Sequence, residues 1–181
     1  MRSLLRILAV LAAGLGAAAH AAGTSDYAGQ ERRDIKSMSA DEIEGYLSGK
    51  GQGLAKPAEL NGYPGPSHVL ALSRELALSD EQRRRTEVLF AAMQAEASER
   101  GRTFVAAERD LDRLFATGTV DRSTLEAALQ RSAALLAAVR QVHLVAHLKQ
   151  IDILDATQRA KYAALRGYDD ATAQPQPHHH H

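Results

Sequence analysis

The residues of this chain with the clearest chemical potential are His143 and His147, which stand four positions apart in a helix-patterned segment. On a helix, side chains at this spacing lie one turn apart on the same side, where two imidazoles can share one metal ion. The pair predicts a site for a divalent transition metal such as Zn, Cu, Ni or Co. The residues that we consider as further ligands are Glu96, Glu99 and His68.

The same two histidines also have a purely structural interpretation. At about 100° per residue, His143 falls on the apolar side of its segment, near Leu125 and Leu136, and His147 falls at the edge of that side. Histidines at a helix or dimer seam often hydrogen-bond to a carbonyl or a carboxylate, and they can respond to acid pH. Metal binding and structural packing are both open on this evidence.

Arginine residues form the second feature, because they recur along a segment that also carries methionine and phenylalanine. Most of them have acidic neighbours and are expected to lie on a solvated face. Arg100 is different, since it interrupts an apolar stripe. A surface that mixes arginine with Met and Phe can hold many unrelated chains, because its contacts need no fixed partner geometry. The client-binding residues that we predict are Arg100, Met93, Phe90, Phe104 and Arg83.

Catalysis has little support in the sequence. The chain has no cysteine and no G-x-S-x-G motif, and the spacing of its Ser, His and Asp residues selects no triad. The glycine-rich run at 48–53 lacks the spacing of a phosphate-binding loop. We therefore expect a protein that is not an enzyme and requires no cofactor.

Two long helix-patterned segments must position these residues. Apolar side chains recur at heptad spacing from Asp80 to about Ala116, and a second apolar stripe runs from Asp121 to about Ile153. The short break between them predicts an antiparallel helical hairpin. Two facing stripes cannot enclose a compact core, so short helices, a second copy or a bound chain must cover the remaining apolar surface. The sequence predicts an all-α fold with short flanking helices, and a homodimer.

Two five-residue motifs bracket this hairpin. Each has leucine first, then a residue suited to cap a helix, and glutamine three positions after the cap. The cap side chain can accept a hydrogen bond from a free backbone N–H, and the glutamine can reach back to the N–H of the cap residue. These motif residues are Leu78, Ser79 and Gln82 in the first copy, and Leu154, Asp155 and Gln158 in the second.

The paired motifs around a helical hairpin resemble the LTxxQ family of periplasmic helical proteins, which contains the Spy and CpxP stress chaperones. The resemblance covers about residues 67–166, and Ser79 and Asp155 replace the threonine of the family's name while keeping its capping chemistry. It implies a cradle-like homodimer that holds unfolded or aggregation-prone proteins without ATP during envelope stress. Related members restrain an envelope sensor kinase or bind heavy metals.

Two functions therefore stand side by side. The first is a periplasmic, ATP-independent chaperone of the Spy and CpxP type. The alternative is a periplasmic heavy-metal sensor or metal-binding resistance protein that uses His143 and His147. An envelope sensor kinase is a further possible partner that the resemblance implies.

The ends of the chain are expected to lie outside the folded domain. Arg2 and Arg6 precede and interrupt an apolar run that predicts a signal peptide over 1–22, cleaved near Ala21 or Ala22. We divide the rest into an arm over 23–66 with a short helix and a Gly/Pro turn, a helical domain over 67–167, and a disordered tail over 168–181. The four final histidines are either native or part of a purification tag.

The net charge of the chain gives no reason to expect binding to nucleic acid or to a membrane surface. Basic and acidic residues number 22 each, and loss of Arg2 and Arg6 with the signal peptide leaves a net charge of −2. We therefore expect an exported periplasmic protein with no membrane insertion after signal cleavage.

Overall fold

The structure is a computed structural model that describes residues 25–168, and over these residues it is all-helical. The predicted signal peptide and nearly all of the predicted tail lie outside this range. The elements are η1 (Gln30–Arg32), α1 (Ala40–Leu47), α2 (Lys56–Glu59), α3 (Pro66–Ala71), α4 (Asp80–Ala116), α5 (Arg122–Ile151) and α6 (Ala156–Leu165). Within the described range, no helix has both the length and the apolar character needed to cross a membrane.

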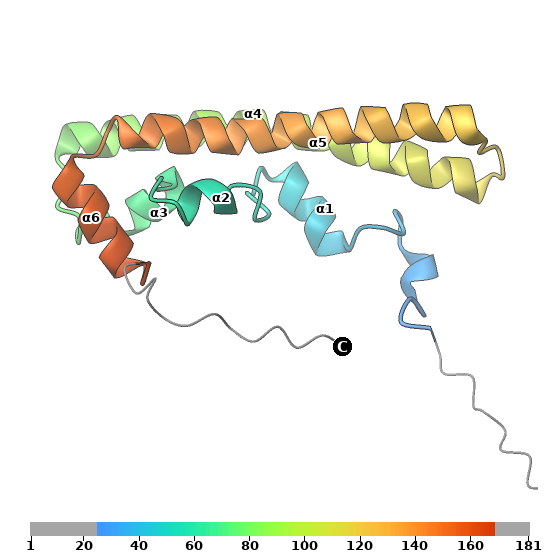
Figure 1. The fold of residues 1–181 in the computed structure, drawn as a ribbon, viewed down its shortest axis with the longest axis horizontal. Helices are drawn as coiled ribbons and strands as arrows, with labels where there is room; N and C mark the ends of the chain where they lie inside the picture. The colour runs from blue at the N-terminus through green and yellow to red at the C-terminus, as the bar shows by residue number, and fades with distance from the viewer. Residues whose placement is uncertain (1–24, 169–181) are drawn as a thin grey trace, which may run out of the picture.

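The predicted helical hairpin is confirmed, since α4 and α5 lie side by side along their lengths (Figure 1). The turn between them contains Gly118 at φ 67°, a backbone conformation that glycine adopts without steric cost. Asp121 then caps α5, because its carboxylate accepts a hydrogen bond of 2.8 Å from the backbone N–H of Thr124. Short polar turn residues and a strong cap therefore reverse the chain sharply.

Both motif copies form the capping boxes that the sequence predicts. The Ser79 hydroxyl accepts from the N–H of Gln82 at 3.2 Å, and the Asp155 carboxylate accepts from the N–H of Gln158 at 2.7 Å. The structure adds a contact that the sequence did not indicate, because the two glutamine amides also bind each other. Gln82 donates to Gln158 at 2.7 Å, and Gln158 donates back at 3.0 Å. The start of α4 is thus tied to the start of α6.

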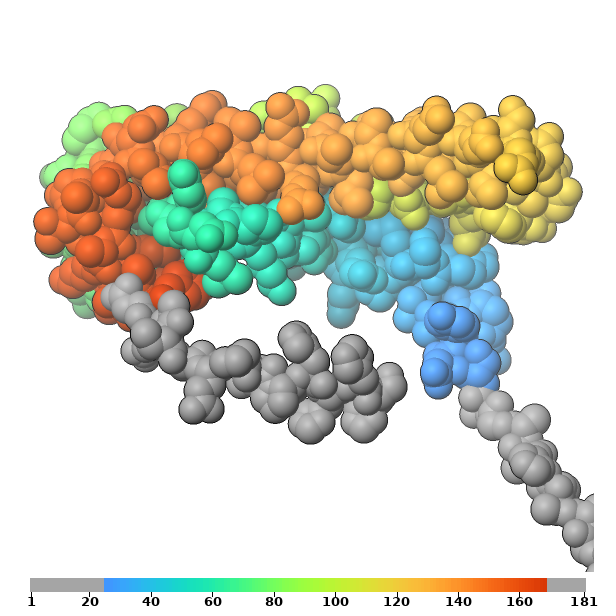
Figure 2. Space-filling view, in the orientation of Figure 1, coloured from blue at the N-terminus to red at the C-terminus, as the bar shows by residue number. Residues whose placement is uncertain are grey.

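The segments before α4 run along one side of the hairpin, from its tip towards its base (Figures 1 and 2). Near the tip, the side chain of Lys36 lies 3.2 Å from Asp112. Further along, Ile35 and Met38 pack against Phe104, Val105 and Val139 in a buried cluster. These short segments therefore cover one face of the hairpin, which is one of the three predicted ways to bury its apolar surface.

Glycine allows α1 to approach α4 closely. A Cβ atom at Gly101 would lie 2.2 Å from the carbonyl oxygen of Tyr46, which no real Cβ atom could do. The ring of Tyr46 packs edge-on against Phe104, with ring centroids 4.9 Å apart. This close approach fixes the position of α1 and of the loop that follows it.

Between Pro66 and the start of α4, the chain is helical only over the six residues of α3, which ends at Ala71. After it, the chain forms turns in which Leu78 N–H donates to Ser73 O at 3.0 Å and Ala77 adopts φ 50°. These turns bury Leu76 against Val69, Leu154 and Tyr162. Tertiary packing thus overrides a helical preference that the isolated segment would favour.

Candidate functional site

A cavity of about 640 Å³ lies between the hairpin and the short segments on its covered side. It brings together side chains from five parts of the chain, among them both histidines of α5. Its main lining residues are Phe90 and Met93 of α4, His143 and His147 of α5, the loop 49–53, Glu59, His68, Arg166 and Tyr168. Three imidazoles, a thioether and one carboxylate therefore belong to residues that line the same half-open cavity.

The orientation of His147 is set by the loop before α3. Its Nδ1 lies 2.6 Å from the carbonyl oxygen of Tyr63. Because a carbonyl can only accept, Nδ1 carries the proton of this hydrogen bond. A Cβ atom at Gly65 would lie 3.0 Å from this Nε2, so glycine is what leaves room for the ring. The structure thus places Nε2 of His147 beside Gly65.

His143 is more deeply buried and less well satisfied. Only 2% of it is exposed, and its Nε2 has no hydrogen-bond partner among the described residues. Burial, and secondly the neighbouring His147, lower the pKa of His143 below its ordinary value. The ring is therefore neutral at physiological pH. A buried imidazole nitrogen without a partner is uncommon and calls for an explanation.

Glu59 is the acidic residue of the cavity, and only 8% of it is exposed. Its carboxylate accepts hydrogen bonds from the Tyr162 hydroxyl, from the Tyr168 hydroxyl at 3.1 Å and from the Gly65 N–H at 3.1 Å. Its Oε1 lies 3.2 Å from Nδ1 of His68, and its Oε2 lies 3.8 Å from Nδ1 of His147.

These contacts determine the charge of Glu59. Burial by itself raises the pKa of this carboxyl, but the hydrogen bonds from Tyr162 and Tyr168 and the nearby imidazoles outweigh burial, so the pKa is lowered overall. Conversely, burial and the neighbouring carboxylate raise the pKa of Tyr162. Glu59 is therefore a charged carboxylate in the cavity lining, and Tyr162, which donates to it, is a neutral phenol.

Of the further ligands considered from sequence, the structure places one in the same cavity as the histidine pair. His68 lines the same cavity. Glu96 and Glu99 do not line it, and Glu96 instead lies 2.7 Å from Arg100. Within residues 25–168, no three His, Cys, Asp or Glu side chains are gathered closely enough to hold a metal ion. A complete site is thus not preformed.

Sequence reasoning missed Glu59 altogether. It lies in a short polar run that has no helical periodicity, and it comes 84 residues before His143 in the chain. Only the folding of α2 and α3 against α5 brings it to the cavity. Met93 was predicted as a client contact, and its thioether also lines the cavity.

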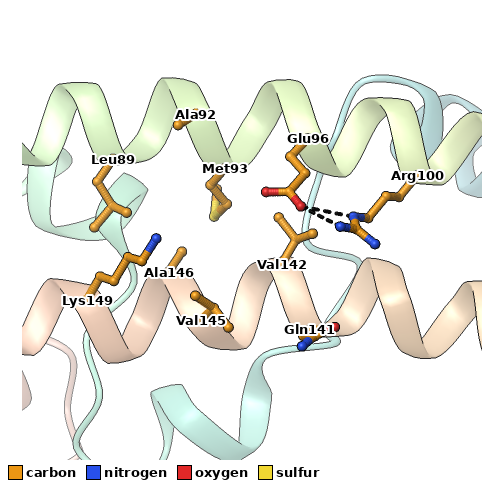
Figure 3. Close-up of a pocket in the computed structure, with 10 residues that line it drawn as sticks. All are labelled: Leu89, Ala92, Met93, Glu96, Arg100, Gln141, Val142, Val145, Ala146 and Lys149. Atoms are coloured by element: carbon orange, nitrogen blue, oxygen red, sulfur yellow. Dashed lines mark hydrogen bonds and ion pairs between the residues drawn. The ribbon is translucent and has the colours of Figure 1, made fainter.

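A separate groove runs between α4 and α5 on the face that the short segments leave uncovered. Figure 3 shows Leu89, Met93, Val142 and Val145 pointing into it, with the Arg100–Glu96 ion pair at one end. A neighbouring hollow shares Leu89, Ala92 and Lys149 with this groove and adds basic side chains at Arg84 and Arg85. Next to it, Val88 is 70% exposed. The groove therefore has an apolar floor and charged rims.

The predicted client-binding residues do not form one surface. Arg100 and Met93 line the groove, while Phe90 lines the cavity on the opposite side. Arg83 is exposed near the start of α4. Phe104 is only 5% exposed and is covered by Tyr46, so it is not accessible to a client in this structure.

Comparison with known proteins identifies one family. A family model described as heavy-metal resistance matches residues 47–161, which is more than half of the chain and includes the cavity loop and the whole hairpin. No curated protein matches the chain. No solved structure matches it either.

Proposed function

The chain belongs to the heavy-metal resistance family, and we propose that it binds a divalent transition metal through His143 and His147. This family is part of the LTxxQ group of periplasmic helical proteins, so the resemblance drawn from the paired motifs is confirmed. Because members are typically periplasmic, the proposed setting is the cell envelope, where the protein senses or buffers the metal.

The observation that carries this proposal is that His143 and His147 line one cavity, while the buried Nε2 of His143 has no hydrogen-bond partner among the described residues. Leaving a buried polar atom unsatisfied costs about 1–3 kcal/mol. A ligand that uses this nitrogen would recover that free energy. Neutral imidazole nitrogens are good ligands for Zn, Cu, Ni and Co, and the lowered pKa of His143 means that no proton must be displaced from it.

The histidine pair needs further donors to complete a coordination sphere. Met93 and His68 line the same cavity, and the His68 side chain is 44% exposed. Thioether sulfur and imidazole nitrogen suit the softer ions of this group. We therefore expect binding that is weaker than at a rigid structural zinc site, as suits a protein that takes up and releases its ion.

Titration calorimetry tests the metal function. The protein should carry alanine in place of His178–His181, because these four histidines can bind metal by themselves. We expect binding of at least one of Zn²⁺, Cu²⁺, Ni²⁺ and Co²⁺, and its loss in the double variant His143→Ala, His147→Ala. The matched control is Glu96→Ala with Glu99→Ala, which removes two charged side chains outside the cavity and should leave binding intact. Unchanged binding in the histidine variant would reject the site.

A second function, that of an ATP-independent chaperone, is favoured by the uncovered groove between α4 and α5. Its apolar floor beside Arg84, Arg85 and Lys149 combines apolar contact with charge, which suits many unrelated unfolded chains. We expect the protein to suppress light scattering by an unfolding client at near-stoichiometric amounts. Leu89→Asp with Val145→Asp should abolish this protection. Leu129→Asp, at an exposed site outside the groove residues, should retain it.

A further inference from the structure

The lining of the cavity carries more positive than negative charge. Lys50, Lys56 and Arg166 line it, beside the single carboxylate of Glu59. Nε of Arg166 lies 3.5 Å from Oε1 of Glu59, so these two charges offset each other. Lys50 and Lys56 form no ion pair with any of the residues 25–168. Two basic side chains of the lining are therefore left without a counter-charge.

The loop that carries Lys50 also has free backbone donors. Gly51, Gln52 and Gly53 line the cavity, and their N–H groups donate to no acceptor in the part of the chain that the structure describes. Gln52 at φ 46° and Gly53 at φ 73° form a turn with left-handed backbone angles. Successive free N–H groups in a turn are a common anion-binding arrangement. The loop therefore combines positive charge with unused hydrogen-bond donors.

Other parts of the lining are apolar. Phe90 and Met93 of α4 contribute an aromatic ring and a thioether, and Leu60 and Pro66 contribute aliphatic side chains from the covering segments. Leu60 is 61% exposed, so a large apolar side chain at the cavity is left uncovered. The cavity volume of about 640 Å³ falls within the range of roughly 300–1,000 Å³ that is typical of small-ligand sites. The space thus suits an organic molecule with an apolar body.

We infer that this cavity binds an amphipathic organic anion, namely a carboxylate with an unbranched apolar chain such as a medium-chain fatty acid. The carboxylate pairs with Lys50 and Lys56 and accepts from the N–H groups of the loop 51–53, while the chain packs against Phe90 and Leu60. Charge orients the ligand, and burial of its apolar chain supplies most of the affinity. The inference goes beyond the proposed metal function and does not depend on it, because the ligand contacts are in the loop, α2 and α4.

The experiment compares three probes by titration calorimetry. The protein carries alanine at His178–His181, and the buffer contains EDTA, so that no metal contributes to the result. Decanoate, below its micellar concentration, should bind saturably with one molecule per chain. Decyltrimethylammonium has the same chain with the opposite charge and should bind at least about tenfold more weakly. Acetate, which has the charge without the chain, should give no detectable binding.

Variants locate the bound decanoate. Lys50→Gln with Lys56→Gln should weaken its binding about tenfold, and Leu60→Ser, at an exposed position, should weaken it about threefold. Lys149→Gln with Lys161→Gln removes the same charge from outside the cavity lining and should leave the affinity unchanged. The groove variant Leu89→Asp with Val145→Asp should also retain binding, since neither residue lines the cavity.

Three results would overturn the inference. They are the absence of saturable decanoate binding, equal binding of decanoate and decyltrimethylammonium, and decanoate binding that is lost in the groove variant but kept in the Lys50 and Lys56 variant. None of these results affects the metal function, which is tested separately by metal titration of the histidine variant. Failure of one proposal is therefore distinguishable from failure of the other.

Discussion

At the scale of single residues, burial determines what His143 can do. In the folded protein its pKa is lowered, and its Nε2 has no partner among residues 25–168, whereas in the unfolded chain the same ring is hydrated and takes up a proton at its ordinary pKa. A neutral imidazole with a free nitrogen can bind a metal ion, and it can also take up a proton as the pH falls. The two properties can be measured separately.

The first prediction concerns pH and stability. Because the pKa of His143 is lowered in the folded state, the unfolded state binds a proton first as the pH falls below about 6.5. The contribution of His143 to stability is therefore complete above that pH and is lost as the pH falls. Between pH 7.5 and 5.5, we expect the free energy of unfolding of the wild type to fall by about 1 kcal/mol more than that of His143→Leu. Urea unfolding followed by circular dichroism measures both; parallel pH profiles would contradict the prediction.

The sequence predicted the histidines of this site but not its acidic residue. His143 and His147 share a helix, so their spacing alone places them side by side. Glu59 and Gly65 reach the cavity, and Tyr162 reaches Glu59, through long-range folding, and no local pattern marks these residues. The sequence predicts Phe104 as a client contact in the apolar stripe of α4. A stripe pattern does not show which of its residues the N-terminal arm covers.

At the scale of elements, the paired motifs do more than cap two helices. Their glutamines also exchange hydrogen bonds, so that each amide oxygen accepts from its own cap and from the other glutamine. Gln82 also donates to Ile153 O at 2.9 Å, which ties the end of the hairpin to the pair. This contact gives a physical reason for glutamine at the last position of both motifs.

The second prediction tests this amide pair. Gln82→Ala and Gln158→Ala should each lower the free energy of unfolding by about 2 kcal/mol, since each leaves polar partners unsatisfied. The double variant should lose about 1 kcal/mol less than the sum, because the second substitution removes a partner that is already unpaired. Gln141→Ala, at an exposed position of α5, is the control and should change stability by less than about 0.5 kcal/mol. Strict additivity would show that the two amides act independently.

The third prediction concerns the contact between α1 and α4. Gly101→Ala raises helix propensity by about 1 kcal/mol, but the new methyl group would meet the Tyr46 carbonyl. We expect a net loss of about 2 kcal/mol in urea unfolding, because overpacking outweighs propensity. Ala106→Gly, at an exposed site of α4, should lower the free energy of unfolding by about 1 kcal/mol, which measures the effect of helix propensity alone. A stabilised Gly101→Ala protein would mean that α1 does not lie where the structure places it.

Element boundaries were predictable where caps and turns mark them. The limits of α4 follow from Ser79 and from the Thr-Gly-Thr break, and the start of α6 follows from Asp155. The end of α3 was not predictable, because it results from turns that bury Leu76 in a cluster with residues far along the chain. The sequence therefore predicts helix ends that are set by local capping and turn residues, and it does not predict ends that are set by contacts with distant residues.

At the scale of the whole molecule, the hairpin has two unlike faces. The short segments cover one face and form the cavity with it, while the groove lies on the other face. A client chain or a second copy of the protein can occupy this groove, and the predicted homodimer stays a prediction.

The fourth prediction separates these two occupants. We expect wild type to sediment as a dimer and Leu89→Asp with Val145→Asp to keep that mass while losing chaperone protection, because the groove serves clients. Sedimentation equilibrium gives the mass, and Leu129→Asp serves as the control. A monomeric groove variant would instead assign the groove to contact between copies.

The central claim is that a metal ion binds between the histidines of α5, and anomalous diffraction from crystals soaked in Co²⁺ or Zn²⁺ tests it most directly. The protein again carries alanine at His178–His181. We predict an anomalous peak inside the cavity, about 2.0–2.1 Å from a ring nitrogen of His143 and of His147. A metal peak found only elsewhere, with the two imidazoles unligated, would contradict the account.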